Sequence, residues 1–345
     1  MYQIRLVKHE ERDQLKKFIK KYWSSEHIFV QENRILDFQH LEDKHYNFVV
    51  AYHTSTNSFH GVLGFIAPSF YRGGKIVLDD HIWLALWKVE KSLTQSNSLG
   101  LDMLNYIEEQ YKPKSISAIG ITKEVALLYR MLGFTVVDMH HMYMLNDQIE
   151  KFDIAQISKH MSTNPHIKSD NYKITEVGFF EINENDLGPA NGTGKNKEYF
   201  LSRYQRHPLY RYKCHEVKKG NQHIAYFIGR MLQVGKKTCY RITDFSFAKQ
   251  PSDDLKDTFK SFLYDHGYEY IDCLYYGSQF DYLSICGFIF NSMDNYVPHY
   301  FEPFDSTKKI TKIAFKSKSN IEFFKGDSDL DRPSIINKIQ EWGYE

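Results

Sequence analysis

The chain has 345 residues, which predicts two domains or one large one, because single hydrophobic cores stop growing near about 250–300 residues. Hydrophobic residues make up 42% and charged residues 25%, a composition that predicts a packed globular protein and excludes a disordered one. Lys and Arg number 44 against 43 for Asp and Glu, so no overall field draws the chain to nucleic acid or to an anionic membrane.

From the N-terminus to about residue 145, the pattern predicts alternating strands and helices. Strands are expected at 2–7, 47–52, 61–66, 80–89 and 115–121, and helices at 10–23, 98–111 and 123–132. Segments 134–137 and 140–145 are expected to begin a last hairpin of this half. The most apolar run, 81–89, is far too short to span a bilayer, and the chain begins without a secretory apolar stretch. We therefore expect a cytoplasmic protein without a membrane partner.

The rest of the chain repeats this plan more weakly. Residues 147–170 are polar and predict a linker, which divides the chain into domains 1–146 and 171–345. In the second half, strands are expected at 223–230, 239–247 and 268–274, with a helix at 253–266 between the last two. Gly287-Phe288 follows as Gly133-Phe134 does in the first half, which indicates duplicated units, each with a mixed sheet flanked by helices.

The four cysteines, Cys214, Cys239, Cys273 and Cys286, are widely spaced and form no metal-binding motif. We expect reduced, mostly buried thiols, no disulfide and no metal.

One loop has the composition of an anion-binding site. Gln95-Ser96-Asn97-Ser98-Leu99-Gly100 lies between the strand at 80–89 and the helix at 98–111. Small residues at a helix start let backbone N–H groups approach an anion, and the helix dipole adds to the attraction. An ordinary helix N-cap would give the same residues, so the loop alone does not decide between the two.

A second segment, Leu128-Tyr129-x-x-x-Gly133-Phe134, supplies the context. Together with Gln95-x-x-Ser98-x-Gly100 it resembles the GNAT superfamily of acyl-CoA N-acyltransferases, with Ser98 in place of the family's first loop glycine. The resemblance covers about residues 4–145. It implies an α/β (α+β) fold of two tandem GNAT-like domains, each with a mixed, mostly antiparallel sheet flanked by helices.

The resemblance also implies the chemistry. Acyl-CoA is the implied co-substrate, bound by the first half. The strand carrying Leu86, Trp87, Lys88 and Val89 would splay from its neighbour, pair with the pantetheine arm and polarise the thioester carbonyl. Tyr129 stands where family members place the acid that protonates the leaving thiolate. The alternative is that Tyr129 only packs on its helix.

The attacking amine must be neutral, and Asp80 or His81 at the start of that strand could take its proton. A polar turn entering the strand explains the same residues, and a weakly basic amine would need no base.

The second half has no such loop after residue 247, where a proline and acids stand instead, and Leu283 replaces Tyr129. We therefore expect it to bind the acceptor. Three clusters supply the expected acceptor-binding residues: Arg203, Tyr204, Arg206, His207 and Tyr210, then Tyr300 and Glu302, then Asp329, Asp331 and Arg332. The arginines could clamp a diphosphate and the tyrosines could stack on a base. A surface helix with solvated cations, and a solvated acidic turn, are the alternatives.

These clusters look like the tandem-GNAT enzymes that acylate the amino group of nucleotide-linked amino sugars, of the anthrose-pathway type. The implied acceptor is a dTDP- or UDP-linked amino sugar, and no nucleic acid is expected as a partner. A tRNA-dependent aminoacyl transferase would favour a basic stripe that this near-neutral chain lacks. A non-catalytic sensor of acyl-CoA or of a nucleotide sugar is the third possibility. The sequence does not indicate the oligomeric state.

Overall fold

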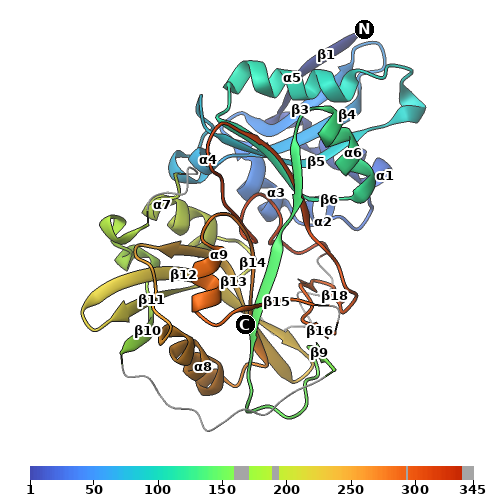
Figure 1. Ribbon diagram of the computed structural model, residues 1–345. Helices are drawn as coiled ribbons and strands as arrows, with labels where there is room; N and C mark the ends of the chain where they lie inside the picture. Colours follow the sequence, from blue (N-terminus) through green and yellow to red (C-terminus); the bar gives the residue numbers. More distant parts are fainter. Residues whose placement is uncertain (159–170, 189–193, 293, 336–345) are drawn as a thin grey trace.

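The computed structural model describes residues 1–158, 171–188, 194–292 and 294–335. Within these residues the chain forms two eight-stranded sheets, mostly antiparallel and flanked by helices, which confirms the predicted fold class. Figure 1 places the first sheet at the top and the second at the bottom. No helix in the described residues is long and apolar enough to cross a membrane.

The first sheet is built mainly from the N-terminal half. Its pairing order is β1 (Tyr2–Lys8), β3 (His45–His53), β4 (Ser58–Ile66), β5 (His81–Val89), β6 (Ser115–Ile121), β19 (Lys312–Ser317) and β7 (Thr135–Asp138), with β2 (Leu41–Glu42) beside β3. The helices of this half are α1 (Arg12–Tyr22), α2 (Ile28–Gln31), α3 (Asn33–His40), α4 (Pro68–Gly73), α5 (Leu99–Tyr111) and α6 (Lys123–Met131).

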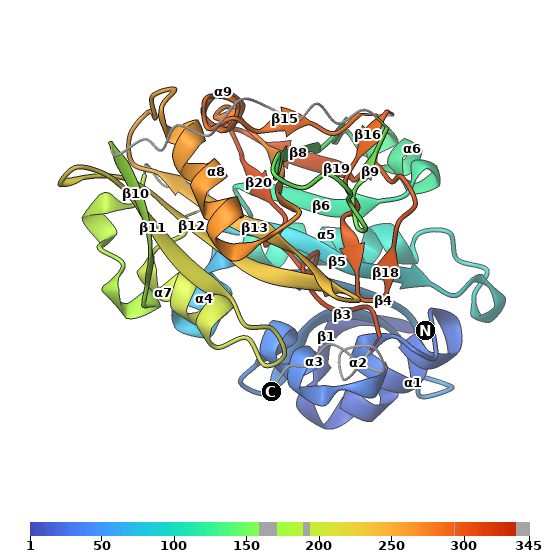
Figure 2. The same ribbon diagram turned by 90° about the horizontal axis from the view of Figure 1, so that it is seen from below.

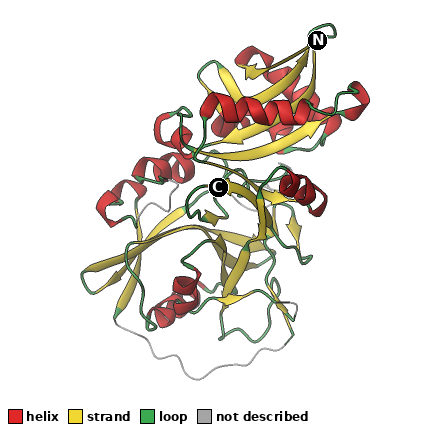
Figure 3. Cartoon of the chain, turned by 45° about the horizontal axis from the view of Figure 1, so that its top comes forward, coloured by secondary structure: helices red, strands yellow, loops and turns green. Residues whose placement is uncertain are grey.

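Helices cover both faces of this sheet because successive strand residues point to opposite sides. Val49 packs with the apolar side of α5, whereas the next residue, Val50, packs with Leu15 and Phe18 of α1. In Figure 3, α5 crosses one face of the upper sheet. The sheet is therefore buried on two sides, which explains the near-continuous apolar run of β5.

The second sheet has the order β10 (Tyr172–Val177), β11 (Lys213–Lys219), β12 (Gln222–Val234), β13 (Lys237–Phe247), β14 (Tyr270–Tyr276), β8 (His140–Leu145) and β15 (Ile289–Phe290), with β20 (Phe323–Phe324) beside β14. The helices of this half are α7 (Lys197–Phe200), η5 (Leu201–Gln205), α8 (Leu255–His266) and α9 (Phe280–Ile285). Two short pairs, β9 (Gln156–Ile157) with β16 (Asn295–Tyr296) and β17 (Tyr300–Phe301) with β18 (Phe304–Asp305), lie outside both sheets.

The two sheets exchange strands. β8, from the N-terminal half, pairs with β14 and β15 of the second sheet, while β19 inserts between β6 and β7 of the first. In Figure 1 the green chain after α6 runs down from one sheet to the other, and Figure 2 shows β19 beside β6. The expected hairpin of 134–137 with 140–145 is therefore wrong. Because β8 and β19 each join the sheet of the other half, the division into sheets does not test the proposed domain boundary at residue 146. That boundary stays a prediction.

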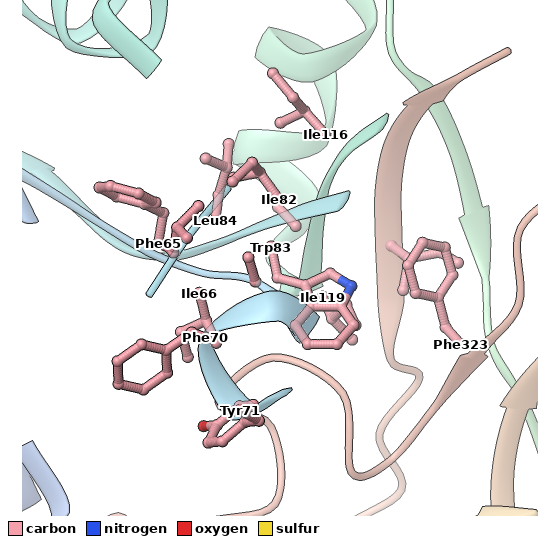
Figure 4. Close-up of a cluster of buried hydrophobic side chains, with 14 of the residues drawn as sticks. Phe65, Ile66, Phe70, Tyr71, Ile82, Trp83, Leu84, Ile116, Ile119 and Phe323 are labelled. Atoms are coloured by element: carbon pink, nitrogen blue, oxygen red, sulfur yellow. The ribbon is translucent and has the colours of Figure 1, made fainter. Parts of the chain in front are cut away.

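A single apolar core joins the halves. It contains Phe65, Trp83 and Ile119 from the first sheet together with Phe323 from β20. Figure 4 shows the ring of Phe323 beside the side chains of β5 and β6. The four cysteines are buried free thiols.

Candidate functional site

The site begins where two parallel strands separate. β5 and β6 pair from His81 with Ser115 to Leu84 with Ala118, and the pairing ends there. Beyond that point β5 stays paired with β4 as far as Val89, while β6 continues along β19. The strands therefore diverge into a wedge whose inner edges have no strand partner in this sheet.

A cavity of about 780 Å³ opens in this wedge. The first half lines it with the end of β5, the loop before α5, the end of β6 and one side of α6. The second half closes it with residues from β13, the segment 299–302 and the segment 325–334. The cavity thus lies between the halves, and both contribute side chains.

The expected cofactor residues mostly line the cavity. Leu86, Trp87, Lys88, Val89, Gln95, Ser96, Asn97 and Gly100 are lining residues, whereas Ser98 and Leu99 are not. Leu99 is buried in the core, and the Ser98 hydroxyl donates to Asp102 at 2.9 Å. A Cβ added at Gly100 would lie 3.4 Å from Nε1 of Trp87, so the start of α5 packs directly on the end of β5.

Tyr129 also lines the cavity. α6 holds its ring edge-on to Trp87 and to Phe134, with centroids 5.9 and 5.0 Å away. Burial raises the pKa of Tyr129 above its usual value, which keeps the hydroxyl protonated near neutral pH. The geometry permits the role of acid but does not test it.

Asp80 and His81 do not line the cavity, although they were expected to supply a base. The Asp80 carboxylate accepts from the backbone N–H of Ser69 at 2.8 Å and pairs with Arg72 at 3.4 Å, holding the start of α4. His81 is buried, with Nδ1 2.6 Å from the Ser115 hydroxyl. Both side chains secure β5 at its paired end, away from the wedge.

Two of the three clusters expected to bind the acceptor do reach the cavity. Their lining members are Tyr300, Glu302, Asp329, Asp331 and Arg332. Arg332 forms an ion pair with Asp329 at 3.0 Å. Glu302 and Asp331 both pair with a buried arginine of β12, Arg230, at 2.9 and 3.1 Å. Burial alone would raise the pKa of Asp331, but Arg230 holds it well below its usual range.

The third cluster does not reach the cavity. Arg203 is completely buried in η5 and donates to the carbonyl oxygens of Gly326 and Ser328 at 3.2 and 3.5 Å. Tyr204, His207 and Tyr210 are also buried; the Tyr204 hydroxyl donates to Asp244 at 2.9 Å, and His207 stacks on Tyr210. Only Arg206 is exposed, and it pairs with Glu198. Arg203 also lies over the ring of Tyr71 in the first half, 5.5 Å from its centroid, and His207 contacts Phe38. The cluster therefore builds the contact between the halves, and a diphosphate cannot reach Arg203 in this structure.

Several lining residues were missed from the sequence, namely Trp23, His27, Arg241, His299 and Lys325. Lys325 follows a buried aromatic pair and lies just before Asp329, Asp331 and Arg332, which were expected to bind the acceptor, and this is the one local signal that could have found it. The others come from three separate parts of the chain, and only the fold brings them together. Within the described residues, no group of three or more His, Cys, Asp or Glu side chains could hold a metal ion.

No protein-family model matches the chain, and no curated protein matches it. Among solved structures, a GCN5-related N-acetyltransferase from Anabaena variabilis is similar, with a TM-score of 0.56 and 11% identity over 92% of this chain and 72% of that one. A probable N-acyltransferase from Enterococcus faecalis gives a TM-score of 0.52 and 8% identity over the same shares. At such identities the likeness shows the fold alone, which is the GNAT fold.

Proposed function

We propose that this chain is an acyl-CoA-dependent N-acyltransferase whose first half binds the acyl donor in the wedge between β5 and β6. The observation that carries the proposal is the end of strand pairing after Leu84 and Ala118, which opens a large cavity beside unpaired strand edges. An extended pantetheine arm can pair with such an edge as an added strand would. A backbone N–H of β5 would then polarise the thioester carbonyl.

The remaining donor contacts follow from the lining residues. Gln95, Ser96, Asn97 and the first turn of α5 offer backbone N–H groups and a helix dipole to the pyrophosphate. Lys88 and Lys91 add positive charge on the same side of the cavity. Tyr129 would give its proton to the departing thiolate.

For the acceptor, we propose a nucleotide-linked amino sugar of the dTDP or UDP type, bound by the second half's side of the cavity. The Arg332 cation and the carboxylates Glu302, Asp329 and Asp331 support a ligand that carries both an amine and an anionic group, and Lys325 lines the same side of the cavity. The buried segment around Arg203 lends no support to this assignment.

A calorimetric titration of coenzyme A tests the donor site. In Gly100→Val the extra methyl groups would displace the Trp87 indole, and we expect affinity to fall about ten- to a hundredfold, or about 1.4–2.8 kcal/mol. Gly100→Ala is the matched control, because its Cβ makes only an ordinary contact, and it should change affinity about threefold or less.

Unchanged affinity in a folded Gly100→Val variant would contradict the donor site. Release of coenzyme A with a panel of nucleotide-linked amino sugars then tests transfer itself. A protein that binds acyl-CoA yet releases no thiol with any amine would be a sensor and not a transferase.

A further inference from the structure

One lysine in the cavity is buried without a paired carboxylate. Lys325 directly follows β20, and its backbone N–H donates to the carbonyl oxygen of Leu274 at 3.2 Å. Its side chain is 3% exposed and lines the cavity, with Nζ 5.3 Å from the ring centroid of Tyr300. In the described parts of the chain, the surrounding carboxylates pair with arginines, and none forms an ion pair with Nζ.

The charges around Lys325 come from every element packed against it. They are Arg230 of β12, Arg241 of β13, Asp272 of β14, Glu302 after β17 and Asp331 after β20, with the imidazoles of His141 and His299 nearby. Lys309 lies over the same Tyr300 ring, 4.4 Å from its centroid, and pairs with Asp305 of β18. Burial lowers the pKa of both histidines, which leaves them neutral near pH 7. Besides Lys325, four carboxylates therefore accompany three cations. With a neutral Lys325 the group carries one net negative charge, and with a protonated Lys325 it carries none.

This balance suits a reaction that begins with an ammonium ion. One net negative charge in a largely buried wall attracts the positively charged form of an amine. If that ammonium then passes its proton to Lys325, the wall becomes neutral beside a neutral amine. The total charge in the cavity does not change, so the transfer incurs no new cost of charge burial.

We propose that Nζ of Lys325 is the general base that takes the proton from the acceptor ammonium, an inference that rests on the proposed N-acyltransferase function. The acceptor N–H bond breaks, its electron pair stays on the acceptor nitrogen, and Nζ becomes an ammonium. The neutral amine attacks the thioester carbon and the C–S bond breaks. Tyr129 gives its proton to the thiolate, the second amine proton replaces it on the phenolate oxygen, and Lys325 returns its proton to water after the amide leaves.

The pKa of the lysine supports this role. Burial, together with Arg241 and Arg230, lowers the pKa of Lys325 to about 8, while Asp331 and Asp272 act in the opposite direction. A base titrating near the working pH is the most effective. The other lining groups are less suitable, since Arg230 holds Glu302 and Asp331 in ion pairs. Burial lowers the pKa of His27 to about 3.

The test is the pH dependence of kcat/KM for the wild type, Lys325→Met and Lys325→Arg, using the most basic amine that turns over. The wild type should show an inflection near pH 8 that both variants lack. Both variants should be about 10²- to 10⁴-fold slower at pH 7.5, with acyl-CoA affinity unchanged. Arg keeps the positive charge but cannot release a proton.

The arginine variant separates a base from an anion-binding group. If Lys325 only held an anion, Lys325→Arg would keep most of the rate and Lys325→Met would mainly raise the acceptor KM, which overturns the proposal. Acylation of Lys325 itself by acyl-CoA, seen by mass spectrometry, would also overturn it. If the Lys325 variants turn over with the same inflection near pH 8 as the wild type, only this inference is contradicted. If the wild type turns over no amine, the proposed function and this inference are both contradicted.

Thermal melting gives a readout that needs no acceptor. A buried lysine whose pKa is lowered is destabilising while protonated, so Lys325→Met should melt at a higher temperature than the wild type at pH 7. The difference should be constant below about pH 8 and shrink between pH 8 and about pH 10.4, because in that range the folded lysine is neutral while the unfolded one still binds its proton. A pH-independent difference would contradict the charge state on which the proposal depends.

Discussion

The two sheets contain the same local arrangement, but only one of the two wedges is open. β5 and β6 form a parallel pair connected through α5, and β13 and β14 form a parallel pair connected through α8. After Ile242 and Cys273 the second pair separates too, and there the chain's own C-terminal part enters. β20 pairs with β14, and the backbone N–H of Gly326 donates to the carbonyl oxygen of Thr243 on β13 at 2.8 Å.

The filled wedge leaves no space in the second half for a ligand placed like the one proposed for the first half. Residues 323–326, which we call the plug, occupy the space between β13 and β14. The same segment leads into residues 329–332 and so brings Lys325, Asp329, Asp331 and Arg332 to the open wedge of the first half. The wedge between β5 and β6 is thus an open cavity. The segment that fills the wedge between β13 and β14 also lines part of that cavity.

The largest expected effect comes from disturbing the plug. A Cβ added at Gly326 would collide with the Tyr204 hydroxyl and lie 2.8 Å from the Thr243 carbonyl oxygen, both buried. Gly326→Ala should therefore lower the free energy of unfolding by about 2–5 kcal/mol, measured by urea denaturation. Gly100→Ala, at the start of α5 beside the open wedge, should change it by no more than about 1 kcal/mol. If Gly326→Ala and Gly100→Ala lowered the free energy of unfolding equally, the conclusion that one wedge is filled and the other open would be contradicted.

The next effect concerns chemistry in the open wedge. Leu283, on α9 of the second half, is buried in that half's core, whereas Tyr129 on α6 faces the cavity. Tyr129→Phe should lower kcat about ten- to a thousandfold, because the thiolate loses its proton donor. Coenzyme A affinity should stay the same, since the ring contacts are kept. A wild-type rate, in an assay where chemistry limits turnover, would reduce Tyr129 to packing.

Acid should lower the free energy of unfolding through one buried histidine in each half. The two contributions should be similar, and each should be smaller than the effects above. Burial lowers the pKa of His40 in the first half and of His215 in the second to about 4. Between pH 6.5 and pH 4 the unfolded chain binds more protons than the folded one, so stability falls as pH falls. At pH 5.5 each histidine should cost about 1 kcal/mol relative to pH 7.5.

Urea denaturation of His40→Gln and of His215→Gln at the two pH values measures how much each histidine contributes to the loss of stability in acid. The exposed His9 is the control, and His9→Gln should leave the pH dependence unchanged. A slope lost in only one of the two buried variants would show that the halves respond to acid differently.

The smallest effect is expected at Arg206. This exposed side chain pairs with Glu198, and Arg206→Ala should change stability by less than about 0.5 kcal/mol and leave the acceptor KM unaltered. Arg203→Ala, three residues earlier, should cost about 2–4 kcal/mol, because Arg203 holds the carbonyl groups of Gly326 in the plug and of Ser328 just after it. A raised acceptor KM in Arg206→Ala would return this segment to the binding site.

Periodicity predicted most regular elements, because both faces of each sheet are covered and the apolar pattern records that burial. The helix expected at 98–111 is α5 (Leu99–Tyr111), and the one expected at 253–266 is α8 (Leu255–His266). The loop before α5 was also found, since small residues at a helix start are a local signal. The strand pairing of 140–145 was not, because strands carry no local mark of which sheet they join.

What the sequence by itself determined is the first half's side of the cavity, the proposed donor side: strand, loop, helix and Tyr129 follow one another within about fifty residues, so local spacing specifies them. Only the tertiary structure decided which residues of the second half line the cavity, on the proposed acceptor side. Asp80 and Arg203 have the composition of site residues, yet burial assigns both to holding the fold. Lys325 gives almost no sequence signal, and it reaches the cavity because a two-residue strand fills the second wedge. Contacts between residues far apart in the chain set which charged groups are buried and which face a ligand, and that information is not local.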